Sequence, residues 1–303
     1  MVKEKDKLLN KIYEYRWCYI FLAPGILVYI MFMLWPVAAS VYYSLFEWEG
    51  FTNWPQKFIG LKNYVELVND KYFWNSMWNT IKYVFVQNIF KLPLTLFIAW
   101  ILNHRRLKGS NFYRTILFIP VVSSTAIIGI VMTFIFSPVN GPVNEILTGI
   151  NILSKPIDFL GRVDTALWVI VAIEVWHYAG QYVIYWLSGL QSIPHRLYEA
   201  AEIDGASSWQ QFIYVTVPAL KPVIIIVSLL SIVNSLRIFA IVQATTGGGP
   251  SFSTDVVTTF IYRNAFASAI TRLGYASAAA VFFGIFVMGL GSVQGTIVNK
   301  IND

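Results

Sequence analysis

The chain alternates between long apolar runs and shorter polar connections. A helix needs roughly 20 mainly apolar residues to cross the hydrocarbon core of a bilayer, where water cannot satisfy unpaired backbone groups. Runs of this length predict an all-α integral membrane protein with about six transmembrane helices. The spans are expected near residues 17–45, 77–102, 115–137, 165–188, 222–245 and 273–298.

Two of the connections between the spans are predicted to contain a short helix outside the bilayer. In residues 61–70, apolar side chains recur at helical spacing on one face, which is typical of a helix lying at the membrane interface. Residues 254–269 favour another short helix ahead of the last span. Since no low-complexity segment or linker interrupts the chain, residues 17–298 are predicted to form a single transmembrane domain.

The composition agrees with a membrane location and excludes several other classes. Hydrophobic residues make up 56% of the 303 residues and charged residues 13%, against about 25% charged in soluble domains. The net charge of +6 does not indicate nucleic-acid binding, because the charges lie in short stretches between the apolar runs. The histidines His104, His177 and His195 are expected in different layers, and Cys18 is the one cysteine, so we expect no metal cluster.

The positions of lysine and arginine predict the orientation in the membrane. Twelve of them lie in the two tails and in residues 103–114 and 189–221, against seven in the longer connections of the opposite side. Because the cytoplasmic side carries the excess of positive residues, this side is predicted to be cytoplasmic. The tails 1–16 and 299–303 are therefore both expected in the cytoplasm, and the apolar run after residue 16 is expected to be a retained anchor.

The connection 189–221 is the most informative part of the chain. It reads GLQSIPHRLYEAAEIDGASSWQQFIYVTVPALK. Pro194 suits the first turn of a helix, the residues that follow are good helix formers, and Gly205 breaks the helix before a second one over 207–217. The segment is too polar to insert into the bilayer, so we expect a helix–turn–helix lying against it.

The spacing within this connection resembles a family signature. Residues 199–201 read EAA, Gly205 follows after three further residues, and V-T-V-P follows after nine more. This closely resembles the EAA-x3-G-x9-I-x-L-P signature of ABC-importer permeases, with two aliphatic replacements. Other stretches resemble the carbohydrate-uptake branch of that family, of the maltose F-subunit and glycerol-phosphate A-subunit type. They are GLKNYVELV at 60–68, FYRTILFIPVVSS at 112–124, TTGGGPSFST at 245–254 and LGYASAAAV at 273–281.

The resemblance implies a type I ABC importer fold in which the EAA loop is a cytoplasmic coupling helix that seats on an ATPase subunit. The residues suit that role, since the acidic side chains can engage basic groups of a partner and the alanines allow close approach. Gly205 permits the sharp turn. The residues expected to couple to the ATPase are Glu199, Ala200, Ala201, Asp204 and Gly205.

The resemblance also implies the other components of the assembly. These are a second, homologous permease forming a heterodimer with this chain, two ATPase subunits, an external substrate-binding protein and the membrane lipid of a bacterial cell. No G-x4-G-K-[ST] phosphate loop occurs in the sequence, and the glycine run 247–249 lacks a lysine. We therefore expect no enzymatic activity and no cofactor in this chain, with ATP and magnesium on the partner ATPase, and no nucleic-acid partner.

Polar groups inside spans are costly, so they are candidates for the substrate site. The resemblance implies sugar contacts on the fourth and fifth spans, and amide, charged and aromatic groups suit hydroxyls and sugar ring faces. The candidates are Trp176, Gln181, Tyr182, Asn234 and Arg237. Lys82 and Lys91 of the second span are expected to snorkel or to pair with a carboxylate such as Glu174.

Two alternatives to an oligosaccharide importer stay open. The substrate could be glycerol phosphate or another small phosphate ester. The chain could also be a stand-alone secondary transporter, with Glu174 coupling transport to protons. The EAA loop argues against the second alternative, because this loop has no role without an ATPase partner.

Overall fold

The computed structural model describes residues 14–50, 57–104 and 107–302. Most of tail 1–16 and the pair Arg105–Arg106 therefore lie outside the described residues. The chain divides into two compact units. One comprises 1–67 with 264–281, and the other comprises 68–263 with 282–303. The single transmembrane domain expected over 17–298 stays a prediction.

The described part of the first unit contains a continuous helical rod. The rod consists of α2 (Arg16–Tyr29), the π-helical turn η1 (Ile30–Leu34) and α3 (Trp35–Tyr43). None of the side chains in its most apolar stretch is buried. Two short strands follow the rod in the chain, β1 (Phe46–Glu47) and β2 (Lys57–Phe58), and they pair antiparallel. Helix α4 (Lys62–Asn69) follows close to the short helix predicted for 61–70.

Polar contacts hold the two-stranded part of this unit. The amide of Asn63 is buried and donates to the carbonyls of Ser44 and Phe46, at 2.8 and 2.9 Å. Gly274 packs so closely that a Cβ there would lie 2.1 Å from the Phe46 carbonyl oxygen. These two hydrogen bonds satisfy the backbone carbonyls of Ser44 and Phe46 in place of water.

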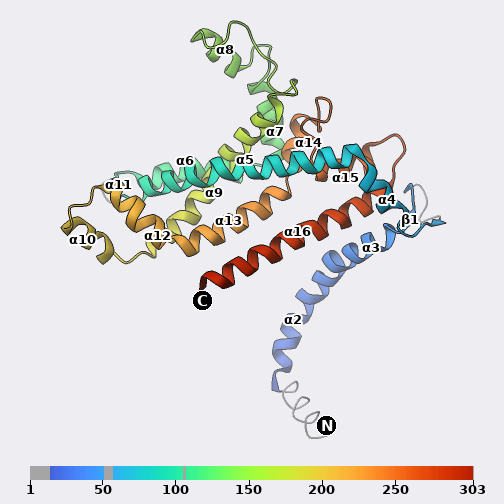
Figure 1. Cartoon of the computed structure of the whole chain (residues 1–303), viewed down its shortest axis with the longest axis horizontal. Coiled ribbons are helices and arrows are strands. Elements are labelled where there is room, and N and C mark those ends of the chain that lie inside the picture. The colour runs from blue at the N-terminus through green and yellow to red at the C-terminus, as the bar shows by residue number, and fades with distance from the viewer. Residues whose placement is uncertain (1–13, 51–56, 105–106, 303) are drawn as a thin grey trace. The chain divides into compact units, whose positions relative to one another are not determined.

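The second unit is a bundle built around two long helices, α5 (Lys71–Leu102) and α9 (Ala166–Gln191), which run side by side (Figure 1). Helix α6 (Ser110–Val122) also packs on α9. Their approach is close because Gly180 lacks a side chain, and a Cβ there would lie 2.1 Å from the Leu117 carbonyl oxygen. Helix α13 (Lys221–Leu236) packs on α5.

The remaining elements of this unit lie mostly towards the ends of the bundle. They are α7 (Thr125–Ile135), α8 (Pro142–Gly149), α10 (Arg196–Ile203), α11 (Ser208–Gln211), η2 (Phe212–Thr216), α12 (Val217–Ala219), α14 (Ala240–Thr245) and α15 (Val257–Tyr262). In Figure 1, α10 and α11 lie near one end of α5, and α14 and α15 lie towards its other end. The turn η3 (Arg263–Ala267) and the helix α16 (Leu273–Asn302) complete the chain, with α16 continuing through most of tail 299–303.

Four helices of the described residues are long and apolar enough to cross a membrane, or up to six if each of two bent pairs is one span. The predicted span 115–137 is one such pair, since α6 and α7 meet at 97°. The other pair joins residues 208–219 to α13 at 72°. Within the span predicted near 222–245 the helix is interrupted, because α13 ends at Leu236 and the next helix, α14, begins at Ala240.

Candidate functional site

The predicted coupling residues lie on a compact helix–turn–helix. Helix α10 ends at Ile203, and Gly205 adopts φ +78°, a left-handed conformation that a side chain with a Cβ disfavours. A capping box between Ser207 and Gln210 then starts α11. The sequence therefore terminates one helix and begins the next within four residues, which fixes the angle between them.

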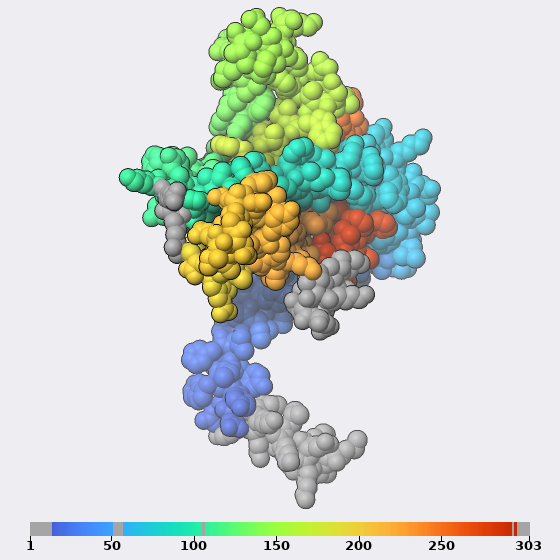
Figure 2. Space-filling model, turned by 60° about the vertical axis from the view of Figure 1, so that its left-hand side comes forward, coloured from blue at the N-terminus to red at the C-terminus, as the bar shows by residue number. Residues whose placement is uncertain are grey.

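This segment presents an open face. Figure 2 shows it, in yellow, at the surface of the second unit. Glu199, Ala200, Asp204 and Gly205 are exposed, and Ala201 is half-buried. Ile203 is 86% exposed, an unusual position for a large aliphatic side chain. Sequence reasoning did not single out Ile203, although an isoleucine in a polar connection was a visible signal.

The inner side of the segment is fastened to the bundle. The Tyr198 hydroxyl lies 3.0 Å from the hydroxyl of Thr216, which is fully buried. Trp209 and Phe212 pack together, and Phe212 packs on Trp100 near the end of α5, with ring centres 4.9 Å apart. Helix α10 is thereby joined to η2, and η2 in turn packs on α5.

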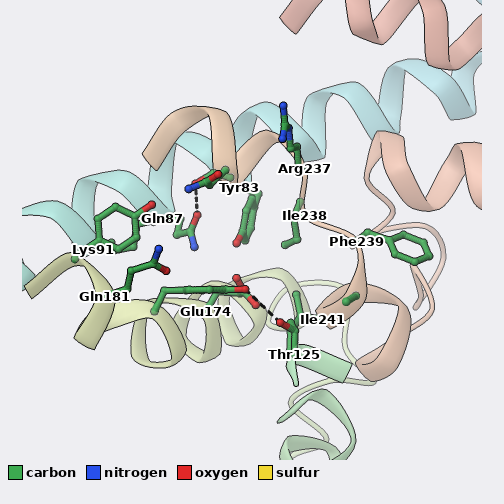
Figure 3. A pocket seen from close by; sticks show the side chains of 15 residues that line it. Tyr83, Gln87, Lys91, Thr125, Glu174, Gln181, Arg237, Ile238, Phe239 and Ile241 are labelled. Atoms are coloured by element: carbon green, nitrogen blue, oxygen red, sulfur yellow. Dashed lines mark hydrogen bonds between the residues drawn. The ribbon is translucent and has the colours of Figure 1, made fainter. Parts of the chain in front are cut away.

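A cavity of about 390 Å³ lies deeper in the second unit, between α5, α9 and residues 234–241 (Figure 3). Side chains with polar groups make up most of its wall. They are Tyr83, Gln87, Lys91, Thr125, Glu174, Tyr178, Gln181, Tyr182, Asn234, Ser235 and Arg237. In Figure 3, Tyr83, Gln87 and Lys91 follow one another along α5, while Glu174 and Gln181 face them from α9.

The break after α13 shapes one wall of this cavity. Arg237 caps the helix, and Ile238 and Phe239 form a non-helical link before α14. The Thr258 hydroxyl donates to the carbonyl of Ile238, so a side chain distant in sequence satisfies a backbone group that the break leaves free. This tertiary hydrogen bond stabilises the break between α13 and α14.

Four of the five predicted substrate residues line the cavity. They are Gln181, Tyr182, Asn234 and Arg237. Asn234 and Arg237 are also exposed, and the guanidinium of Arg237 points away from the centre of the cavity in Figure 3. Trp176 is not part of this wall and is 47% exposed. The structure brings the first four together and leaves Trp176 apart; their roles stay predictions.

Lys91 lies differently from the sequence expectation. It is only 2% exposed, so it does not snorkel to a polar surface. Among the described residues, no ion pair within 4 Å joins it to Glu174, although this carboxylate attracts the ammonium from farther away, as the sequence led us to expect. Its ammonium instead lies 4.2 Å from the centre of the Tyr182 ring, which is a cation–π contact.

A buried polar network ties α13 to α5 behind the cavity. The Ser235 hydroxyl donates to Gln87 at 2.5 Å, and that of Ser231 donates to Asn88. Asn88 also donates to Ser235 at 3.3 Å. The spacing of four residues between the two serines puts them on one face, a signal that sequence reasoning did not use.

Glu174 and His177 are also buried, with 3.8 Å between the carboxylate Oε1 and the imidazole Nδ1. In the part of the chain that the structure describes, that oxygen and both ring nitrogens have no hydrogen-bond partner. Among the described residues, no group of three or more His, Cys, Asp or Glu side chains could hold a metal ion.

Comparison with known proteins identifies the family. Residues 91–303 match the family model described as the binding-protein-dependent transport system inner membrane component. The lactose transport system permease protein LacF of Rhizobium radiobacter is 34% identical over 278 residues, which cover 91% of this chain and 92% of LacF. The sn-glycerol-3-phosphate transport system permease protein UgpA of Escherichia coli O157:H7 is 30% identical over 271 residues, covering 89% of each chain.

The fold is shared with a solved structure. A crystal structure of a bacterial ABC transporter involved in the import of the acidic polysaccharide alginate superposes with a TM-score of 0.84 and 24% identity, over 98% of this chain and 100% of the other. The apolar helices, the family match and the relatives of nearly equal length agree with one another. This chain is therefore a multi-pass membrane protein of the binding-protein-dependent transport system inner membrane component family, the permeases of ABC importers.

Proposed function

We propose that the chain imports a sugar, most simply an oligosaccharide, as one half of a translocation pathway driven by ATP. Its two tails and the segment 189–221 face the cytoplasm, as the lysine and arginine distribution favours. A second, homologous permease completes the pathway. Two ATPase subunits supply the energy, and an external binding protein delivers the substrate.

The exposed face of α10 supports the coupling role. Its carboxylates, alanines and the exposed Ile203 offer a surface that a protein partner could cover. The tight turn at Gly205 and the Tyr198–Thr216 contact make the segment rigid enough to transmit a movement. The ATPase partner that docks on α10 binds ATP and magnesium, and α10 transmits the movement of this partner to the spans.

The cavity is the observation that carries the transport role. Its wall combines amide, hydroxyl and aromatic groups, the set that hydrogen-bonds sugar hydroxyls and stacks on sugar rings. Asn234 and Arg237 are exposed at its rim, so a second permease on this side would enclose the substrate. Gln181, Tyr182, Asn234 and Arg237 are the proposed substrate contacts, and Trp176 is withdrawn from this set because it lies off the wall.

The test is reconstitution of the complete complex in liposomes with its binding protein. Uptake of oligosaccharide should require ATP, the binding protein and both permeases, and mass spectrometry identifies the imported species. Uptake by this chain alone, without ATP or other subunits, would contradict the proposal.

Glycerol phosphate or another small phosphate ester is the second candidate substrate. The specific observation that favours it is Lys91, a cation held in the cavity wall. The same liposome assay separates the two candidates, because sugars and phosphate esters differ in mass and charge.

A further inference from the structure

Lys91 is a buried charged group without an ion pair within 4 Å among the described residues, and Glu174 acts on it only from farther away. It lies in the wall of the cavity and is 2% exposed. Within the described residues, its ammonium makes no hydrogen bond and no ion pair, and its one polar contact is the face of the Tyr182 ring. A buried ammonium is unfavourable unless other groups compensate it, and an aromatic face compensates a cation less than a hydrogen-bonded anion does.

The position of Lys91 along α5 excludes snorkelling to the end of the helix. The helix continues from Lys91 to Leu102, about three further turns. Snorkelling needs a helix end within reach of the side chain, and here the end is too far. The Tyr182 ring, itself 2% exposed, holds the ammonium at the cavity instead.

The charges around the cavity do not balance. Glu174 is the one carboxylate among the wall residues, and it lies beyond 4 Å from Lys91. Arg237 adds a second cation at the rim. The lining residues carry two cations and one carboxylate, although the guanidinium of Arg237 points away from the centre of the cavity in Figure 3. A neutral sugar would leave this excess of positive charge in place.

We propose that the substrate carries an anionic group, a carboxylate or a phosphate, and that the Lys91 ammonium binds this group in the cavity. This inference rests on the proposed function, since it names the class of sugar imported. The sugar ring and hydroxyls face Tyr182, Gln181 and Asn234, while the anion takes the place opposite the Tyr182 ring. Lys91 is then a specificity-determining residue on α5, outside the two spans where substrate contacts were expected.

The experiment offers the reconstituted complex, with its binding protein and ATP, a defined mixture of probes. The mixture contains neutral malto- and xylo-oligosaccharides, oligogalacturonides as the carboxylate arm, and glucose 6-phosphate with glycerol 3-phosphate as the phosphate arm. Mass spectrometry of the liposome interior reports which species accumulate. Accumulation in the carboxylate or the phosphate arm is the expected result and identifies the source of the anion.

Variants then test Lys91 itself. Lys91→Met should lower uptake of the accumulated anion by about 10- to 100-fold, the loss of one hydrogen bond to a charged group, and Lys91→Arg should retain most of it. Lys82→Met is the matched control, since Lys82 is half-buried on the same helix but lies off the cavity wall. Yield of the detergent-extracted complex is measured for each variant, and uptake is expressed per complex.

Two results would overturn the inference while leaving sugar import intact. One is accumulation of neutral oligosaccharides alone. The other is anion uptake by Lys91→Met at the wild-type rate per complex. If no probe accumulates with ATP present, the proposed sugar import itself fails, and the anion-binding role falls with it.

Discussion

The hydroxyl groups of Tyr198 and Thr216 lie 3.0 Å apart and join α10 to η2. Thr216 is fully buried and Tyr198 is half-buried, so the contact is shielded from water. The contact joins α10 to η2, and η2 leads through α12 into α13. The pair therefore connects α10 directly to a fully buried residue of η2.

Removing the Tyr198–Thr216 hydrogen bond should weaken the coupling between ATP hydrolysis and transport. Tyr198→Phe deletes one hydrogen bond, worth about 1 kcal/mol, without changing the shape of the ring. We expect two- to fivefold less substrate imported per ATP hydrolysed, at normal complex yield, measured in liposomes. Tyr214→Phe is the control, because Tyr214 lies in η2 together with Thr216 but is 75% exposed. Equal losses in both variants would argue against a specific role for the Tyr198 hydroxyl.

Gly205→Val should uncouple transport from ATP hydrolysis. A β-branched residue at φ +78° costs on the order of 1 kcal/mol or more, so the turn between α10 and α11 would change. Uptake should fall while ATPase activity persists. Gly60→Val provides the matched control, since Gly60 has φ +58° and also faces open space, but lies outside the coupling segment. Normal uptake by Gly205→Val at normal yield would count against the coupling role.

Arg237→Ala and Asn234→Ala should each reduce substrate-stimulated uptake more than basal ATPase activity. Both residues lie at the rim of the cavity, and neither change creates a buried void, because both side chains are exposed. Complex yield in detergent is measured alongside uptake. A lower yield with normal uptake per complex would show that these residues serve assembly and leave the rim unassigned.

Asp255→Asn should destabilise the second unit. The carboxylate is fully buried and accepts from Ser76 and Thr259 at 2.7 Å and from Arg263 at 2.8 Å. Breaking a buried ion pair costs about 3–5 kcal/mol, so the thermal midpoint of the detergent-solubilised complex should fall.

Asp164→Asn is the comparison for that change. Asp164 pairs with Arg162 at 2.8 Å, but both side chains are more than half exposed. Solvent and salt screen an exposed pair, so it contributes little to stability and the midpoint should barely move. A similar fall for both variants would mean that burial of Asp255 does not decide the effect.

The turn at Gly205 was predictable because the responsible residues are local. A helix-forming stretch, a glycine and a serine-led capping box stand within a short segment, and each acts on its immediate neighbours. The break after Leu236 was not predictable in this way. No glycine or proline marks residues 237–239, and the Ile238 carbonyl is satisfied by Thr258, twenty residues away.

The substrate candidates on α9 illustrate a periodicity that was available and not applied. Glu174, Tyr178 and Gln181 are spaced four and three residues apart, so they share one face and line the cavity. Trp176 is two residues after Glu174, about 200° around the helix, and therefore points elsewhere. The position of the Lys91 side chain was harder to predict from the sequence, because its ammonium is held at the cavity by the ring of Tyr182, a residue on another helix.

The rod from Arg16 to Tyr43 buries none of its most apolar stretch within the described chain. Its side chains are therefore selected for affinity to their surroundings and not for fit to a neighbour within this polypeptide. Exchanges among leucine, isoleucine, phenylalanine and methionine should be tolerated there far more widely than in α9, where side-chain shape is fixed by close packing. Sequence drift between related proteins should accordingly concentrate in this first helix.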